Sequence, residues 1–358
     1  MILKQTSLHA EHLKLGALMV PFADFDMPIH YSSVKDEIAA VRTSSGIFDV
    51  GHMGEFFITG VDATAFADYL VTNDIQTPPM GKAIYSPLCR EDGTVVDDLL
   101  VYKIASDRIL LCVNASNMTK DWEWVNSHKH LFRVKVENHS DEYSLLALQG
   151  PRSEEILKRL GLLPSGEFPY YSVKEIKFDG RPLILARTGY TGEDGFELFC
   201  SHEACKKLWP AILECGAKPC GLGSRDVLRL EATYPLYGHE IHDHVTPLDA
   251  NLKWTVKMNK KIFIGKESLA HYRPHYRQVK LSITGGVPRQ GYTVENASGM
   301  TIGTISSGTH SPTLGAGIAL AHIEIEKFPA DKNFLINIRG KKIQAKFHDE
   351  PFVKGGHK

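Results

Sequence analysis

Residues 187–198 read RTGYTGEDGFEL, a glycine-rich loop that runs directly into a strand. Its glycines stand at 189, 192 and 195, which is a turn pattern and not the GxGxxG spacing of a dinucleotide-binding loop. Glu197 lies between two apolar residues, so its carboxylate stands in a half-buried strand and needs a hydrogen-bond donor. Two donors remain open at this point: an internal arginine, or a ligand that offers two parallel N–H groups.

The next conspicuous stretch is residues 220–238, CGLGSRDVLRLEATYPLYG. It predicts a helix over 225–233 with Arg225 and Arg229 four positions apart on one face. Arg225 stands near the helix N-terminus, where positive charge is disfavoured, so it calls for an anionic or carbonyl partner. An ion pair with a carboxylate of the same domain explains it as well as a ligand does.

Asp97 and Asp98 open an apolar strand, DDLLVYK, at residues 97–103. Strand alternation puts Asp98 on the same face as Tyr102 and Asp97 on the opposite face, so the two carboxylates are not expected to form a close dyad. A functional carboxylate beside an aromatic ring is one interpretation. An aspartate that bonds a turn amide at the start of the strand is the alternative.

Two motifs suggest metal ligands without having the required spacing. The histidines of HEIHDH, residues 239–244, are three and two positions apart, whereas the zinc-protease motif needs four on a helix, and we expect a surface loop here. The pairs Cys200/Cys205 and Cys215/Cys220 each enclose four residues, but they are divided between a strand end and a helix. The sequence therefore predicts no metal site.

Composition restricts the class of protein. The chain has 358 residues, 43% of them hydrophobic and 23% charged, which fits about two or three globular domains. Lys plus Arg number 41 against 42 Asp plus Glu, so no basic excess favours nucleic acid. No apolar run approaches the roughly 18 residues of a membrane span, no signal or transit segment is visible, and six cysteines are too few for a disulfide scaffold. We expect a cytoplasmic protein.

The apolar periodicity predicts a mixed α+β chain with an all-β end. Helices are expected at 34–45, 63–71, 118–125, 202–215 and 225–233, and strands at 55–59, 97–104, 108–114, 143–148, 182–186 and 196–200. Ser33 and Asp36 resemble a capping box for the first helix, Gly46 is a candidate for its C-terminal stop, and Pro210 is expected to kink or divide the fourth.

After about residue 275, short strands alternate with Gly, Asn and Ser turns, which indicates a small barrel or sandwich. The strands are expected at 279–283, 301–306, 318–323, 334–338 and 343–347, with the boundary at 272–276.

Taken together, these motifs resemble the T-protein family of the glycine cleavage system, the aminomethyltransferases. Besides the two stretches quoted first, residues 48–56 (FDVGHMGEF) resemble the family's FDVSHMGE, with Gly51 in place of Ser. Residues 22–28 (FADFDMP) resemble FAGWEMP, with Asp24 in place of Gly. GKAIYS, VVDDLLVYK, VNASN and ISSGTHSPTLG follow in the family's order, so the resemblance runs almost end to end.

The resemblance implies an α+β fold of three domains in a cloverleaf-like arrangement around a central folate site. A discontinuous folate-binding domain would comprise 1–50 and 140–270, a second α+β domain 51–139, and an all-β barrel or jelly-roll-like domain 271–358.

The resemblance also implies the reaction. A lipoyl arm of the carrier H-protein brings an aminomethyl group, tetrahydrofolate takes the carbon, and ammonia leaves. The products are 5,10-methylenetetrahydrofolate and the dihydrolipoyl carrier. Tetrahydrofolate is the co-substrate and H-protein the partner, and no metal, nucleotide, nucleic acid or membrane is involved.

Residue roles follow from the matching motif positions. Asp98 matches the family's essential carboxylate, which orients the folate, stabilises positive charge as an iminium-like carbon forms, and relays a proton. Glu197 matches the residue that accepts the paired N–H groups of the pterin. The other expected folate contacts are Asn114 and Arg225, with Tyr85, Tyr102, Tyr171, Tyr190 and Met53 as walls of the pterin site, although ordinary core packing would explain each wall residue as well.

Three alternatives share the expected fold. A folate-dependent demethylase would take a methyl group from a small substrate. A tRNA-modifying relative carries a cysteine motif, KGCYxGQE, where this chain has ATYPLYGHEI without cysteine. A non-catalytic folate-binding module would keep Glu197 but have no use for Asp98, so the presence of both favours the enzyme.

Overall fold

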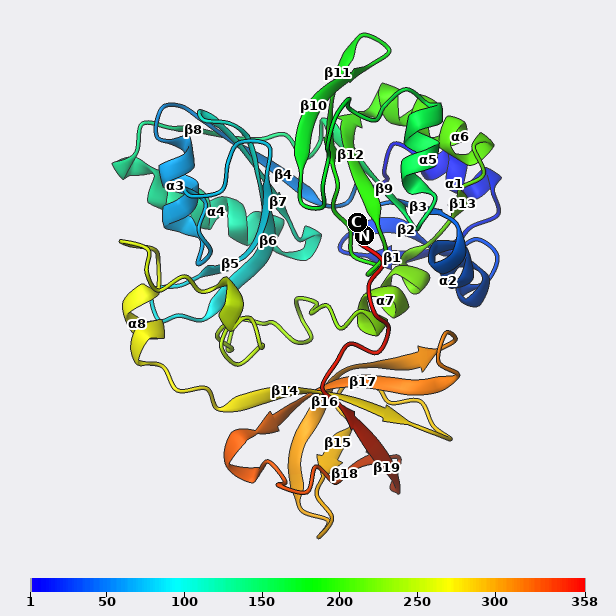
Figure 1. The fold of residues 1–358 in the computed structure, drawn as a ribbon, viewed down its shortest axis with the longest axis vertical. Helices are drawn as coiled ribbons and strands as arrows, with labels where there is room; N and C mark the ends of the chain where they lie inside the picture. The colour runs from blue at the N-terminus through cyan, green and yellow to red at the C-terminus, as the bar shows by residue number, and fades with distance from the viewer. Residues whose placement is uncertain (1, 358) are drawn as a thin grey trace.

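The structure, a computed structural model, describes residues 2–357 and contains three large sheets in three lobes (Figure 1). Two lobes combine a sheet with helices, and the third is a closed barrel. The fold class is therefore mixed α and β over several domains with an all-β C-terminal domain, as predicted. Among the described residues, no helix is both long and apolar enough to cross a membrane.

The first lobe is built on a six-stranded sheet and a two-stranded ribbon. The sheet has the order β10 (Val173–Phe178), β11 (Arg181–Ala186), β12 (Gly195–Ser201), β9 (Tyr143–Gln149), β3 (Gly46–Asp49) and β13 (Lys218–Pro219), and the ribbon pairs β1 (Leu18–Phe22) with β2 (Phe25–His30). The helices of this lobe are α1 (His9–Lys14), α2 (Val34–Thr43), α5 (Ser153–Arg159), α6 (His202–Glu214) and α7 (Leu222–Glu231).

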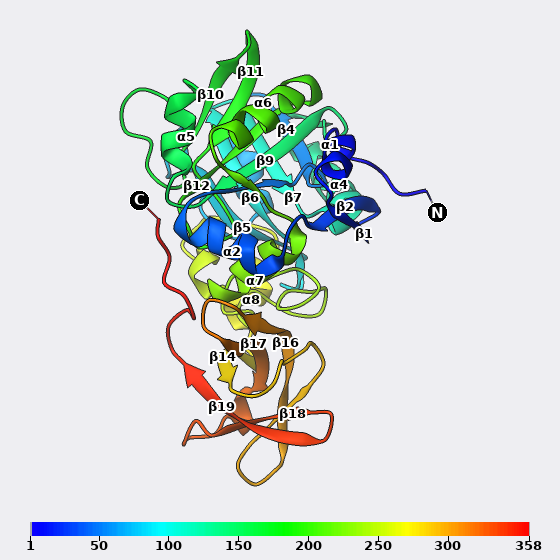
Figure 2. The same cartoon turned by 90° about the vertical axis from the view of Figure 1, so that its right-hand side faces the viewer.

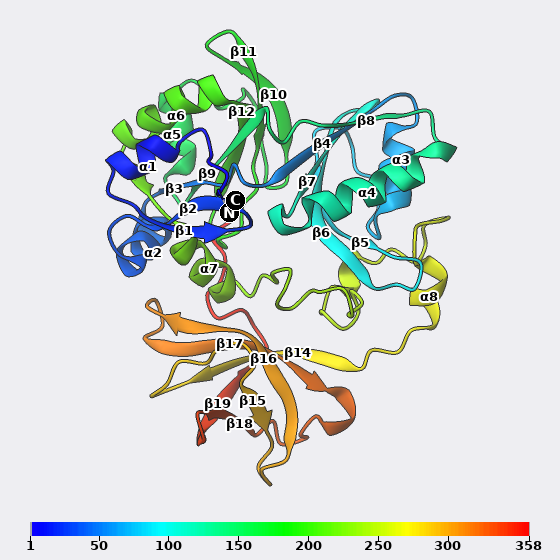
Figure 3. The same cartoon turned by 180° about the vertical axis from the view of Figure 1, so that it is seen from behind.

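The second lobe is a five-stranded antiparallel sheet with two helices. The strand order is β5 (Ala83–Cys89), β6 (Val95–Ala105), β7 (Arg108–Val113), β4 (Gly54–Thr59) and β8 (Lys135–Asn138), with α3 (Ala63–Leu70) and α4 (Met118–His128). A connecting segment with α8 (Lys266–His271) then leads along this lobe to the barrel (Figure 3).

The third lobe is a closed barrel with its own apolar core. Its order is β14 (Tyr276–Ile283), β17 (Ala316–Glu324), β16 (Thr301–Ser311), β15 (Thr293–Glu295), β18 (Phe334–Ile338) and β19 (Lys341–His348). Only the three-residue β15 escaped prediction, because it is too short to show alternation. After β19 the chain returns from the barrel to the first lobe, where Val353 N–H donates to the carbonyl of Glu231 (Figure 2).

Local signals placed most helices correctly, with two corrections. Ser33 caps α2 by accepting the N–H of Asp36 at 3.1 Å, as predicted. Gly46 does not stop this helix, which ends at Thr43. It opens β3, where a Cβ would stand 2.5 Å from Val41 and 2.6 Å from Cys220. The helix is also not divided at Pro210, since α6 runs through this residue as one helix.

The two mixed lobes meet along β5 and β10, and this contact positions the candidate site. Ala83 N–H donates to the carbonyl of Tyr171, and Val173 N–H donates to that of Gly81, at 2.9 and 2.8 Å. An apolar core fills the space between the two sheets and contains side chains of β4, β6, β7, β11, β12 and α7. Strand alternation in β6 thus directs one face toward this shared core and the other toward the core of its own lobe.

Candidate active site

Asp98 lies on β6 at the edge of the shared core and is held by two side chains. The Tyr85 hydroxyl donates to its Oδ2 at 2.9 Å, and the Asn114 amide donates to its Oδ1 at 3.1 Å. Burial, and then the neighbouring charge of Asp97, raise the pKa of Asp98 to about 7. Asp98 can therefore take up or release a proton near neutral pH.

Asp97 faces the opposite way, as strand alternation predicts, and is completely buried. It accepts the Asn114 N–H at 3.0 Å, the Asn114 amide at 2.9 Å and the Asn117 amide at 2.5 Å. The two carboxyls lie on opposite faces of β6 and are linked indirectly. The Asn114 amide bonds both carboxyls, and the charge of Asp97 raises the pKa of Asp98.

Glu197 lies on β12 and is only 6% exposed. Its Oε2 accepts the Tyr102 hydroxyl at 3.0 Å and the Thr188 hydroxyl at 2.5 Å. No described residue donates a hydrogen bond to its Oε1. Among the described residues, neither an arginine nor any other N–H group donates a hydrogen bond to Glu197, so hydroxyls satisfy one carboxylate oxygen and the other is left for a further donor.

Arg225, near the start of α7, contributes an unsatisfied donor. Its Nη1 is buried and has no hydrogen-bond partner among the described residues. The guanidinium lies 5.1 Å from the centre of the Tyr190 ring, a cation–π distance. Burial lowers the pKa of Arg225, while the charge of Glu197 opposes that shift. The arginine therefore has a charge partner but not a full set of acceptors.

The aromatic residues stand around these polar groups. Tyr190 donates its hydroxyl to the carbonyl of Pro235, and its ring stacks on Tyr234 at 5.8 Å. The ring of Tyr102 packs edge-on against Phe199 at 5.2 Å. Burial raises the pKa of both Tyr85 and Tyr190, and the charge of the nearby Asp98 adds to both shifts.

Two predicted wall residues are joined to the site by packing alone. Tyr171 has a left-handed backbone with φ of 62° and meets the ring of Tyr170 edge-on at 4.6 Å. It and Met53 are half-buried against the shared core. Neither side chain hydrogen-bonds Asp98 or Glu197 within the described residues, so their contribution is apolar surface.

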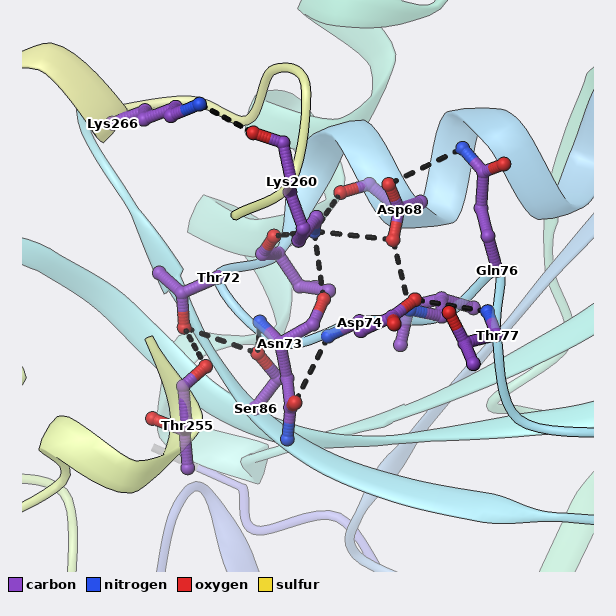
Figure 4. Close-up of polar contacts among 12 residues, drawn as sticks. Asp68, Thr72, Asn73, Asp74, Gln76, Thr77, Ser86, Thr255, Lys260 and Lys266 are labelled. Carbon is purple, nitrogen blue, oxygen red and sulfur yellow. Dashed lines mark hydrogen bonds and ion pairs between the residues drawn. The ribbon is translucent and has the colours of Figure 1, made fainter. Parts of the chain in front are cut away.

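Two residues of this site were not predicted from the sequence. Thr188 belongs to the quoted loop at 187–198, and its hydroxyl on Glu197 could have been anticipated from that motif. Trp254 had no such signal: its ring stacks on Tyr85 at 5.9 Å and 25° while 58% of the residue remains exposed. The segment of Trp254 is fixed beside β5 by polar contacts around Lys260 (Figure 4).

Residues 239–244 do not form the surface loop that was predicted for all of them. Glu240 is fully buried and accepts Arg229 at 3.0 Å and the Ser306 hydroxyl at 2.5 Å. His239 faces the carbonyl of Ser306 at 3.0 Å. These groups are engaged with the protein, and the described part of the chain has no cluster of three potential metal ligands.

Comparison with known proteins gave matches over nearly the whole chain. The family model "GCVT N-terminal domain" matches residues 8–260, and "Glycine cleavage T-protein C-terminal barrel domain" matches residues 277–354. An aminomethyltransferase of Chloroherpeton thalassium is 45% identical over 98% of this chain and 99% of its own. One of Thermotoga maritima is 43% identical over 99% and 98%.

A solved structure agrees at the level of the fold. The glycine cleavage system aminomethyltransferase T of Bartonella henselae superimposes with a TM-score of 0.93 at 31% identity. The superposition covers 99% of each chain, so it extends over all three lobes.

Proposed function

The chain belongs to the glycine cleavage T-protein family and is an aminomethyltransferase, and from this premise we propose how its site works. Folate is the family's substrate. In this proposal tetrahydrofolate accepts the carbon of an aminomethyl group that the lipoyl arm of H-protein delivers. Ammonia, 5,10-methylenetetrahydrofolate and the dihydrolipoyl carrier are the products.

The observation that carries the proposal is a buried arginine donor without a protein acceptor, whose charge interacts with a carboxylate that has both of its hydroxyl donors on one oxygen. The Tyr102 and Thr188 hydroxyls both donate to Oε2 of Glu197, which leaves Oε1 for a ligand, and the buried Nη1 of Arg225 has no acceptor among the described residues. The pterin of tetrahydrofolate presents adjacent N–H donors and a carbonyl oxygen, which complement a carboxylate and a guanidinium. Hydrogen bonds to charged partners are the stronger ones, so this pair can both bind and orient the ring.

The rings around this pair supply flat apolar surface. Tyr85, Tyr171 and Tyr190 with Met53 would line the pterin and the adjoining part of the folate. Tyr102 is fully buried and acts chiefly through its hydroxyl, which holds Glu197. Asn114 would contact the folate with its backbone or side-chain oxygen, because its amide nitrogen is already engaged by the aspartates.

Asp98 is the proposed catalytic group. As a carboxylate it stabilises positive charge on the carbon in transit. With a pKa of about 7 it can also hold the proton that passes between a folate nitrogen and the departing ammonia. The Tyr85 and Asn114 hydrogen bonds fix both carboxyl oxygens, so the group is oriented before the substrates meet.

The relatives favour this activity over the alternatives, since they are aminomethyltransferases and not demethylases or binding modules. The division at 1–50 with 140–270, 51–139 and 271–358 is proposed as the domain structure. The separate sheets support it, whereas residues 250–269 pack against the second lobe. A cytoplasmic location and independence from metal remain predictions. A chelator is expected to leave the rate unchanged.

The test is ammonia release from aminomethylated H-protein, with and without tetrahydrofolate. We expect release that depends on both, and 5,10-methylenetetrahydrofolate in equal amount. H-protein without its lipoyl group is the control. Methyl transfer from a small amine, or equal release without folate, would refute the proposal.

A further inference from the structure

A second buried carboxyl lies behind Asp97. Asp121, on α4, is completely buried and shares a side-chain hydrogen bond with Asp97. As an ionised carboxylate, Asp121 would have no hydrogen-bond partner on either oxygen within the described residues, so its contact with Asp97 requires a proton on one of the two carboxyls. The two carboxyls therefore depend on each other.

Two carboxyls in contact need a proton between them, and the surroundings decide which one holds it. Asp97 accepts three N–H bonds from Asn114 and Asn117, and these stabilise its ionised form. Asp121 accepts no such N–H hydrogen bond from the described residues. The nearest cation on its helix is Lys120, but that ammonium binds the Tyr237 hydroxyl at 2.6 Å and Asp243 at 3.3 Å. Burial and the charge of Asp97 accordingly raise the pKa of Asp121 well above its usual range.

The pair of Asp97 and Asp121 is linked to Asp98 through the side-chain amide of Asn114. Asn114 Nδ2 lies 2.9 Å from Asp97 Oδ1, 2.9 Å from the Asp98 carbonyl and 3.1 Å from Asp98 Oδ1. The position of Asp97 thus fixes the amide that holds Asp98. A change at Asp121 reaches the site without any contact to substrate.

We propose that Asp121 is a positioning residue for Asp98: as a neutral carboxyl it keeps its proton and donates a hydrogen bond to Asp97, which in turn holds the Asn114 amide against the catalytic carboxylate. The inference rests on the proposed function, because it takes Asp98 as the reacting group. Other ionisable groups whose charges interact with these three aspartates include Tyr85, Tyr190, Cys112, Tyr237 and Lys120.

Two variants of Asp121 separate the loss of its hydrogen-bond donor from the loss of its carboxyl group. Asp121→Asn still donates an N–H to Asp97, so kcat and its pH profile are expected to stay near wild type. Asp121→Leu has no donor, and we expect kcat to fall about tenfold or more while the KM for tetrahydrofolate changes little. Asp97 then takes up the proton itself. Its charge no longer opposes ionisation of Asp98, so the acid limb of the profile moves to lower pH.

Infrared spectroscopy observes the proton on Asp121 directly and does not depend on the Asp121→Leu variant. The wild-type protein at neutral pH should show a protonated-carboxyl C=O band that disappears in Asp121→Asn. Glu55 is the matched control. Burial raises its pKa as well, so Glu55→Gln should remove a different component and leave the Asp121 band in place.

The outcomes distinguish this inference from the proposed function. A band that persists in Asp121→Asn, an Asn variant as impaired as the Leu variant, or a Leu variant with wild-type kcat and pH profile would each overturn the role of Asp121. None of these bears on Asp98 itself. If Asp98→Asn turned over normally, the proposed function would lose its catalytic residue, and this inference would fail with it.

Discussion

At the scale of single residues, Asp97 and Asp98 are adjacent in sequence yet meet different surroundings. Asp98 reaches the shared core and the tyrosine rings, and Asp97 reaches the amides of Asn114 and Asn117. The faces could be predicted from alternation alone. Their coupling through Asn114 could not, because it depends on the register between β6 and the end of β7.

Asp98→Asn is expected to keep the fold and the affinity for tetrahydrofolate and to lose most turnover. Removing one electrostatic stabiliser typically costs about 2.7–4 kcal/mol, or roughly a hundred- to thousandfold in kcat. In the wild type, the rate should fall as pH drops through about 7, where Asp98 takes up its proton.

Asp97→Asn is the control for that experiment. It removes the charge that disfavours ionised Asp98, so the pKa of Asp98 falls and activity persists to lower pH. Its loss of kcat should be much smaller. The test is to measure pH–rate profiles of Asp97→Asn and Asp98→Asn. Equal losses of activity in the two variants would show that the catalytic role is wrongly assigned to the Asp98 face of β6.

Glu197→Gln should fail mainly in binding tetrahydrofolate. Its oxygen can still accept Tyr102 and Thr188, but its NH2 group then meets the donors of the pterin. Losing a buried hydrogen bond to a charged group costs about 1–3 kcal/mol, which corresponds to roughly tenfold to a hundredfold in Kd.

Calorimetric titration beside a melting curve of the ligand-free protein tests this expectation. If Glu197 served only the protein, the variant would melt at a lower temperature and bind tetrahydrofolate normally. That pattern would remove Glu197 from the proposed site.

At the scale of elements, short-range patterns predicted what short-range forces determine. The Ser33 cap set the start of α2, and apolar alternation located β6 and β7. Trp254 could not be predicted to stack on Tyr85, since that contact requires residues 253–264 to return to β5 from far along the chain.

Lys260 is at the centre of the polar contacts that hold residues 253–264 in place (Figure 4). It is nearly buried, and its ammonium donates to the carbonyls of Asp68, Val71 and Asn73 at 2.6, 2.7 and 2.7 Å. The Asp68 carboxylate lies 3.2 Å away. A single side chain thus satisfies the end of α3 and the turn before β5.

Lys260→Met is expected to lower the melting temperature markedly. The three carbonyls lose their donor and Asp68 is left as a poorly compensated charge, which typically costs about 3–5 kcal/mol. Lys261→Met, at the exposed neighbouring position, is the control and should melt like the wild type. Differential scanning calorimetry compares them, and identical melting of the two variants would contradict a structural role for Lys260.

At the scale of the whole molecule, the barrel is joined to the first lobe partly by buried polar contacts of α7. Arg229 is 1% exposed and donates to Glu240 at 3.0 Å and to the Ser307 hydroxyl of β16 at 2.9 Å. Glu231 accepts the Ser311 hydroxyl of the same strand at 2.6 Å. The sequence predicted both arginines of this helix on one face but not their separate partners, because Glu240 and the serines belong to other parts of the chain.

Replacing one member of the Arg229–Glu240 ion pair should destabilise the protein more than replacing both. Arg229→Met leaves the Glu240 carboxylate buried without its cation, and Glu240→Leu removes the buried carboxylate partner of Arg229, which then keeps only the half-exposed Asp226 at 2.8 Å. Either change is expected to cost about 3–5 kcal/mol. The double variant Arg229→Met/Glu240→Leu leaves no unpaired charge, and replacing a buried ion pair with apolar residues is often close to neutral. Its melting temperature should therefore lie above that of both single variants, with tetrahydrofolate binding retained because neither residue forms a hydrogen bond with Asp98, Glu197 or Arg225. A double variant that melts no higher than the weaker single variant would mean that the ion pair itself, and not the avoidance of a lone buried charge, holds the barrel to α7.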